Sequence, residues 1–162
     1  MNTDNIKSYA PQARSAFIAS MTAQAAKYGI TATTITSIQV RGDVTIIGDR
    51  PFPAAVAKPR AALVQKIEQL GFDQVMEQVA YSWFNRLCAI RYMELHDYLG
   101  HGRRLLSHPD QSEGYQILDD CLDIDLPGLN QQRVRELKLD GTQDEALYRE
   151  LLLAQCHALH EA

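Results

Sequence analysis

The sequence predicts a mainly α-helical protein of about five to six helices, with one small β-hairpin near residues 33–47. Apolar residues recur at spacings of three and four through several segments, and glycine or proline bounds most of these segments. One stretch of β-branched residues interrupts the helical pattern. A chain of 162 residues, 46% hydrophobic and 22% charged, is long enough to bury one core. We therefore expect residues 1–162 to form a single helical domain.

The first helix is predicted over about residues 11–28. Pro11 is placed near its start, where a missing backbone N–H costs least. Phe17 and Met21 follow at helical spacing among several alanines, and Gly29 provides the stop.

A β-hairpin is predicted next, because residues 33–40 and 44–47 are rich in β-branched side chains and residues 41–43 supply a turn. Residues 48–59 contain three prolines and indicate a connector. The hairpin and connector together, residues 33–59, are thus inserted between the first and second helices.

The rest of the chain is predicted to be helical apart from one loop. Residues 101–114 are polar and indicate an exposed loop. Residues 115–126 predict a short helix or turn, with Ile117, Leu118, Cys121 and Leu122 facing inward. The longer helices are predicted over residues 60–70 before Gly71, 73–99 before Gly100, 129–139 before Gly141, and from about 143 onward.

Composition limits the classes of function. The formal net charge of −4 argues against a free-standing, non-specific nucleic-acid binder, because phosphate affinity depends on dense Lys and Arg. Cys88, Cys121 and Cys156 are widely spaced in apolar surroundings, which indicates buried free thiols in a reducing compartment. The start has no secretory pattern, and no apolar run approaches the length that spans a bilayer. We expect a cytoplasmic protein without membrane contact.

Residues 81–102, YSWFNRLCAIRYMELHDYLGHG, place polar side chains inside a strongly apolar helix. The apolar face is formed by Val79, Trp83, Leu87, Ile90 and Leu95, and Phe84, Cys88 and Tyr98 widen it. We therefore expect Asn85, Arg86, Arg91 and Glu94 to form a buried structural network, with Arg91 and Glu94 paired at i, i+3, because buried charges need partners. Direct contact of these residues with a ligand or nucleic acid is the alternative.

No catalytic, cofactor-binding or metal-binding residue is predicted within this chain. Cys156, His157 and His160 contain zinc-ligand types, but a closed site needs four ligands and no second close pair follows. Asp110 with Glu136 and Lys138 matches the written pattern of a restriction-type nuclease. However, Glu136 and Lys138 fall in a helical segment, where side chains two residues apart point away from each other. There is no glycine-rich nucleotide loop and no nucleophile with a convincing base.

Arg103, Arg104 and Arg41 are the candidates for contact with DNA phosphates. The first two follow each other in the predicted polar loop, and Arg41 lies at the tip of the predicted hairpin. Solvated surface is the alternative role, and any phosphate contact would position DNA rather than read its sequence.

Several stretches resemble the amino-terminal region of the PglX family, the adenine-specific DNA methyltransferases of type 1 BREX phage-defence systems. These stretches are MNTDNIKSYAPQAR, YSWFNRLCAIRYMELHDYLGHG, RRLLSHP and DEALYRELLLAQCHALHEA. They occur in the family's order from one end of the chain to the other, while residues 31–59 look less like the family. The resemblance implies a parent enzyme that transfers a methyl group from S-adenosylmethionine to the N6 atom of adenine.

Such chemistry requires a cofactor loop resembling Asp-Pro-Ala-Cys-Gly-Ser-Gly and a catalytic Asn-Pro-Pro-Tyr, and neither occurs in this sequence. The last helix also reaches the end of the chain without a stop signal. We therefore expect a fragment that has no methyltransferase activity alone. It would support the catalytic domain of the same polypeptide, engage DNA through the parent enzyme, or contact other BREX proteins. The alternative is a stand-alone helical protein–protein interaction module of a defence system.

Overall fold

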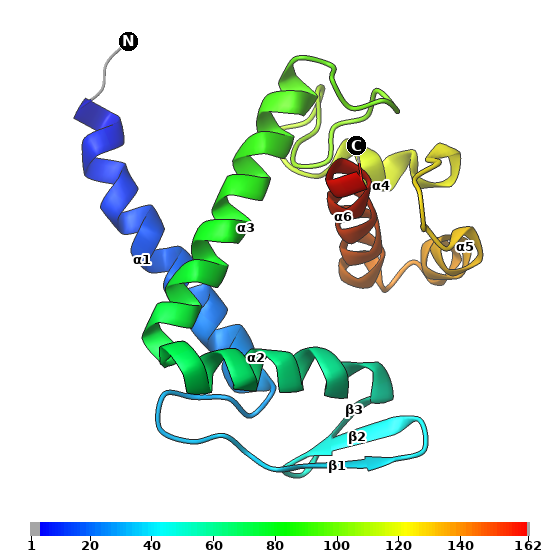
Figure 1. The fold of residues 1–162 in the computed structure, drawn as a ribbon. Helices are drawn as coiled ribbons and strands as arrows, with labels where there is room; N and C mark the ends of the chain where they lie inside the picture. Colours follow the sequence, from blue (N-terminus) through cyan, green and yellow to red (C-terminus); the bar gives the residue numbers. More distant parts are fainter. Residues whose placement is uncertain (1–3, 162) are drawn as a thin grey trace. The chain divides into compact units, whose positions relative to one another are not determined.

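A computed structural model describes residues 4–161, with side chains described from residue 7 to residue 160. The fold is mainly α-helical with one small antiparallel sheet, as the sequence predicts (Figure 1). The helices are α1 Asp4–Lys27, α2 Ala57–Leu70, α3 Phe72–Leu95, α4 Gln116–Asp119, α5 Gln131–Asp140 and α6 Asp144–Glu161. The strands are β1 Ile38–Arg41, β2 Val44–Ile47 and β3 Arg50–Pro53, and short 3₁₀ turns cover Ala54–Val56 and Cys121–Asp123.

The chain divides into two compact units, Met1–Phe84 and Asn85–Ala162, which we call the first unit and the second unit. Helix α3 contributes its beginning to the first unit and its end to the second. Each unit has its own hydrophobic core. That residues 1–162 act as one domain stays a prediction.

Helix α1 begins earlier than predicted, and Pro11 lies inside it rather than at its start. The helix ends in a Schellman motif, in which the Gly29 amide donates to the Ala26 carbonyl and the Ile30 amide to the Ala25 carbonyl. Gly29 adopts a positive φ of 69°, which permits this reversal. The motif places Ile30 and Ala25 together in the core of the first unit.

The predicted connector 48–59 is wrong in part, because its residues 50–53 form a third strand. The strand order is β1-β2-β3, and Pro51 and Pro53 pair with Ile46 and Val44. The Ala54 amide donates to the Asp43 carbonyl, so hydrogen-bonded pairs alternate along β3 and its prolines fall at the other positions. Prolines that face the open edge of a sheet lose no ladder bond and discourage pairing with another chain.

Buried Arg60 of α2 holds the irregular segment that follows α1. Its Nε donates to the Tyr28 carbonyl at 2.8 Å and its Nη2 to the Thr36 carbonyl at 2.5 Å. Burial lowers the pKa of this guanidinium below its ordinary value, but arginine stays charged at neutral pH. The core beside it is formed by Ala25, Ile30, Ile67, Val75 and Met76.

The core of the second unit gathers α3, α4, α5 and α6 around side chains that are almost fully inaccessible. These include Ile90, Leu105, Ile117, Cys121, Val134, Leu137, Leu147 and Leu151. The side chain of Asn130 caps α5 by accepting from the Arg133 amide at 3.0 Å. Leu122 is exposed, which corrects its predicted inward orientation, because the Cys121–Asp123 turn carries it outward.

The predicted burial of three cysteines holds for two of them. Cys121 is buried and Cys156 half-buried, whereas Cys88 is exposed on α3. Burial raises the pKa of the Cys121 and Cys156 thiols above the ordinary value, so both are uncharged at neutral pH.

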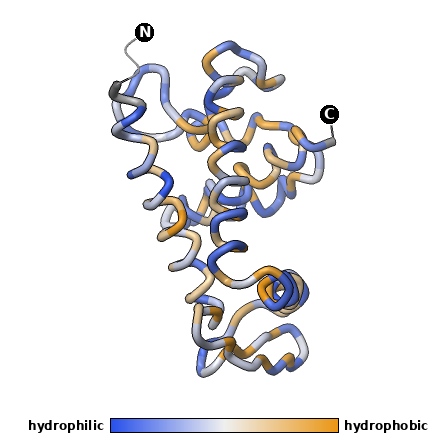
Figure 2. Tube along the Cα trace, turned by 60° about the vertical axis from the view of Figure 1, so that its left-hand side comes forward, coloured by the Kyte–Doolittle hydropathy of each residue, from blue (hydrophilic) through white to orange (hydrophobic). Residues whose placement is uncertain are grey.

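Hydrophobic and hydrophilic residues alternate along the helices in Figure 2. Within residues 4–161, no helix is both long enough and apolar enough to cross a membrane.

Replacing Gly29 by alanine tests the close packing at the end of α1. An added Cβ would lie 2.8 Å from Ile47 Cγ2 and 2.9 Å from Thr36 Cβ, and the positive φ would add strain. We expect Gly29→Ala to lower the free energy of unfolding by about 3 kcal/mol, measured by urea denaturation followed by circular dichroism.

Gly48→Ala is the matched control, because Gly48 has a φ of 60° in the same unit but its Cβ would meet only Thr36 Cγ2, at 3.8 Å. Backbone strain alone predicts a loss of about 1 kcal/mol there. Equal losses in the two variants would contradict the steric account.

Candidate functional site

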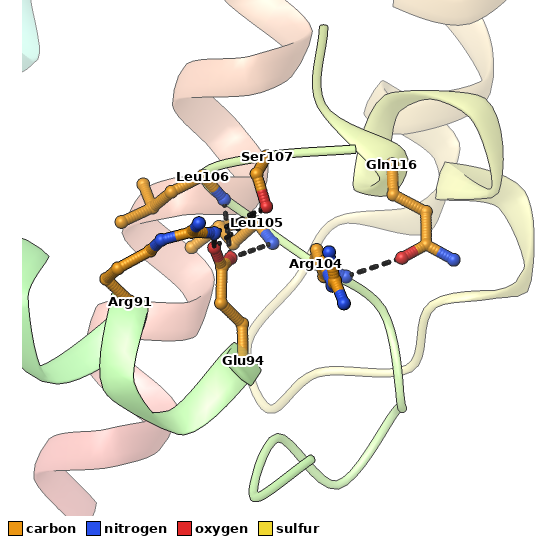
Figure 3. A network of polar contacts seen from close by, with 7 residues as sticks. All are labelled: Arg91, Glu94, Arg104, Leu105, Leu106, Ser107 and Gln116. Carbon is orange, nitrogen blue, oxygen red and sulfur yellow. Dashed lines mark hydrogen bonds and ion pairs between the residues drawn. The ribbon is translucent and has the colours of Figure 1, made fainter. Parts of the chain in front are cut away.

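The polar centre of the second unit is Glu94, in the last turn of α3 (Figure 3). Its Oε2 accepts hydrogen bonds from the Leu105 and Leu106 amides, both at 2.8 Å. Its Oε1 accepts from the Ser107 hydroxyl at 3.1 Å and forms an ion pair with Arg91. The Leu105 and Leu106 amides lie outside any helix or strand and so have no acceptor in regular secondary structure. One buried carboxylate accepts hydrogen bonds from both.

The loop that Glu94 holds comprises residues 96–115, and we call it the Glu94 loop. Helix α3 ends at Leu95, earlier than predicted, because Asp97 adopts a left-handed φ of 56° and the Tyr98 amide donates to the Met93 carbonyl. Leu105 then buries its side chain completely. The prediction of a wholly exposed loop is therefore wrong, since the middle of the loop is part of the core.

Gln116 fastens the Glu94 loop from its other side. The Arg104 amide donates to Gln116 Oε1 at 2.9 Å (Figure 3). The Gln116 amide donates to the Ser107 carbonyl at 3.1 Å. The Ile117 amide also donates to the Arg104 carbonyl at 3.0 Å. The backbone of residues 104–107 is consequently fixed between α3 and α4.

His101 ties the start of the loop to α6. Its Nδ1 accepts from the Arg103 amide at 3.0 Å, which leaves the proton on Nε2. Nε2 lies 2.7 Å from Oε1 of the buried Gln155 and donates to it in this tautomer. The neutral imidazole therefore matches both of its partners.

The predicted polar network of α3 is only partly assembled. Arg91 and Glu94 form the expected pair, in which the Glu94 side chain is 0% exposed and the Arg91 side chain 44%. Asn85, Arg86 and Arg91 are exposed, so their predicted burial is wrong. Buried residues of α3 follow one stripe only, and Phe84, Leu95 and Tyr98 of the predicted apolar face are exposed as well.

The three arginines proposed to contact DNA differ in whether a neighbouring side chain already pairs with the guanidinium. Arg103 is half-buried and its Nε lies 2.5 Å from Asp120 Oδ2, so its charge is already balanced. Arg104 is half-buried, and its guanidinium has no hydrogen bond or ion pair among the side chains described. Arg41 lies in the first unit and donates to Gln39 Oε1 at 3.0 Å.

Arg103 and Arg104 line a polar hollow of about 270 Å³ in the second unit. Glu94, Asp97 and Gln116 also line it, so the hollow carries both signs of charge. Among the described residues that line the hollow, Arg104 is the cation without an ion pair, so it would attract an anionic ligand. A metal ion would be repelled by the two arginines that lie beside the carboxylates.

Of the residues that hold the Glu94 loop, Arg91 and Glu94 were identified from the sequence and the others were missed. Ser107 and Gln116 carry no local signal, because their partners lie on other elements. No three of the described His, Cys, Asp and Glu side chains gather in a group that could hold a metal ion.

Two curated proteins match this chain over nearly its whole length. The Adenine-specific methyltransferase BrxX of Escherichia coli O9:H4 (strain HS) is 46% identical over 170 aligned positions, which include 100% of this chain. The chain is a relative of the BREX adenine-specific methyltransferases. The Adenine-specific methyltransferase PglX of Lacticaseibacillus casei (strain Zhang) is 29% identical and aligns with 99% of the chain. The resemblance seen in the sequence is thus confirmed.

The chain spans only 14% of the length of BrxX and 15% of the length of PglX. It matches their amino-terminal region. No protein-family model matches the sequence.

Removing the Glu94 carboxylate tests its role in the second unit. Glu94→Ala would leave the buried Leu105 amide without an acceptor, so we expect the free energy of unfolding to fall by about 2–4 kcal/mol. Urea denaturation of the purified chain provides the measurement.

Glu136→Ala is the matched control, because Glu136 pairs with Arg133 at the same i, i+3 spacing in the same unit but is 53% exposed. An exposed pair of this kind contributes less than about 1 kcal/mol. If the free energy of unfolding fell equally in the two variants, the Glu94 carboxylate would not be what holds the loop in place.

Proposed function

We propose that this chain is the amino-terminal helical region of a BREX adenine N6-methyltransferase and supports the rest of that enzyme without catalysing the reaction itself. The observation that carries the proposal is the 46% identity to BrxX, which extends over the whole chain but covers only 14% of BrxX. The matching segment of BrxX is one part of that larger protein. Residues 1–162 would act as one supporting domain, in the cytoplasm where host DNA lies.

The methyl transfer belongs to the remaining part of the enzyme. The sequence contains neither a cofactor loop of the Asp-Pro-Ala-Cys-Gly-Ser-Gly type nor an Asn-Pro-Pro-Tyr motif. S-adenosylmethionine and the extruded adenine would therefore bind outside this chain. The catalytic domain of the same polypeptide is the first partner of this region, and other BREX proteins are further partners.

The contribution to DNA engagement would come from the Glu94 loop. Its backbone is held by Glu94 and Gln116, so the side chains that it carries are presented in a fixed arrangement. Arg104 lacks an acidic partner within the described part of the chain, whereas Arg103 is paired with Asp120. A phosphate would gain more from Arg104, because Asp120 competes for Arg103. With a net charge of −4, the region would add a single contact rather than bind DNA alone.

A second candidate function is a stand-alone interaction module of a defence system. It is favoured by large aromatic side chains that the first unit leaves exposed, among them Tyr9 and Tyr81. The two functions are separated by sequencing the gene downstream of codon 162. A reading frame that continues into the cofactor and Asn-Pro-Pro-Tyr motifs supports the methyltransferase, and a stop codon there supports the module.

Substitution of Arg104 in the full-length enzyme tests the DNA contact. We expect Arg104→Ala to weaken DNA binding about 3- to 10-fold at low salt and to reduce the slope of log affinity against log salt concentration by about 1. Arg103→Ala should weaken binding less, because Asp120 already neutralises that charge. Fluorescence anisotropy with labelled duplexes at several salt concentrations gives both quantities.

Arg149→Ala is the control, since Arg149 is an exposed arginine of α6 in the same unit. It should leave the affinity and the salt slope unchanged. If Arg104→Ala behaves like this control, the Glu94 loop does not contact phosphate.

A further inference from the structure

The first unit contains an apolar groove between α1 and the beginning of α3, with a volume of about 580 Å³. Both helices are labelled in Figure 1. The small residues Ala13 and Ala80 are buried and form its floor. Phe17 and Phe84 meet edge to face at the groove, with ring centroids 5.5 Å apart.

The walls of the groove are aromatic and exposed. Tyr9 is 67% exposed and Tyr81 68%, and Phe84 is exposed too. The polar groups lie at the rim, where Arg14 and Glu77 form an exposed ion pair. An apolar trough with a charged rim is the pattern of a surface that another protein segment covers.

The lining residues repeat at the spacing used in helix packing. Ala10, Ala13 and Phe17 are three and four residues apart on α1, and Glu77, Ala80 and Phe84 repeat that spacing on α3. The lining extends from residue 9 to 18 on α1 and from 74 to 84 on α3, so at 1.5 Å per residue the groove is about 14–15 Å long. That length accommodates nearly three turns of a third helix, and alanines on the floor let its backbone approach closely.

We propose that this groove receives an amphipathic helix from the remaining part of the parent methyltransferase. The inference rests on the function proposed above. BrxX extends far beyond this segment, since 100% minus the 14% covered leaves 86% of its length outside. The helix would present apolar side chains at i, i+3 or i+4, and i+7, with charged neighbours placed to meet Arg14 and Glu77.

A small molecule and a second copy of this chain fit the groove less well. Ligand pockets fix their occupants with a few polar groups inside, whereas the polar groups here lie at the rim. Helices α5 and α6 of a second copy are not free to enter the groove. Among the described helices, α5 and α6 already bury Val134, Leu137, Leu147 and Leu151 in their own core.

The test is photo-crosslinking in the full-length enzyme. Tyr81 is replaced by p-benzoylphenylalanine, an aromatic residue of similar shape, and the crosslinked peptides are identified by mass spectrometry. The enzyme is prepared as an equal mixture of ordinary and ¹⁵N-labelled protein, which separates crosslinks within one molecule from crosslinks between two. Tyr98 carries the same replacement as a control, because it is a tyrosine of the second unit with a similar exposure of 61%.

We expect residue 81 to crosslink within the same molecule to one peptide outside residues 1–162, at positions three or four residues apart. The Tyr98 variant should not reach that peptide. Crosslinks that join heavy and light molecules would assign the groove to a second copy and overturn the proposal. Crosslinks confined to residues 1–162, or none, would overturn it as well.

A second variant tests the groove without relying on the crosslinking reaction. Tyr81→Lys places a charge at the groove while the side chain stays solvent-exposed in this unit, so the first unit should remain folded. We expect limited proteolysis to cut the full-length Tyr81→Lys enzyme at least about five times faster than the Tyr98→Lys enzyme. Equal rates would contradict the docked helix.

A failure of the groove proposal can be distinguished from a failure of the proposed function. If the reading frame stops at codon 162, no parent chain exists and the proposed function fails before any crosslink is measured. If the full-length enzyme exists but residue 81 finds no helix, only the groove proposal fails.

Discussion

The arrangement of the second unit depends on the Glu94 carboxylate. Twenty residues between α3 and α4 contain no helix or strand, and buried backbone amides in such a segment need acceptors from elsewhere. Glu94 accepts from two of these amides and from Ser107, while the half-exposed Arg91 balances its charge. Leu105 can then enter the core beside Ile90 and Ile117 without leaving its amide unsatisfied.

In the first unit, a buried arginine rather than a glutamate supplies hydrogen bonds to the backbone of an irregular segment. Arg60 of α2 donates to the carbonyls of Tyr28 and Thr36, where Glu94 of α3 accepts from amides. In both units, one buried charged side chain on a helix holds an irregular segment against that helix. In the second unit, Glu94 also lines the polar hollow that contains Arg104. In the first unit, the groove is lined by residues of α1 and α3 and not by Arg60 or its two partners.

The sequence predicted the elements that obey local rules. Gly71 and Gly141 ended α2 and α5 where expected, because glycine adopts positive φ without strain. Strand β3 was missed because its two prolines indicate a connector, although an edge strand tolerates them. The end of α3 was placed too late, since aspartate rather than glycine adopts the left-handed conformation there. Of the site, only the Arg91–Glu94 pair follows from local spacing, whereas the Leu105, Ser107 and Gln116 contacts depend on the path of the loop.

Amide hydrogen exchange measured by NMR on the purified chain tests the central role of Glu94 most directly. The Leu105 and Leu106 amides donate to a buried carboxylate, so they should exchange about as slowly as the Leu151 amide in the middle of α6. The exposed Ser112 and Glu113 of the same loop should exchange far faster. If Leu105 and Leu106 exchanged as fast as Ser112 and Glu113, Glu94 would not hold this loop.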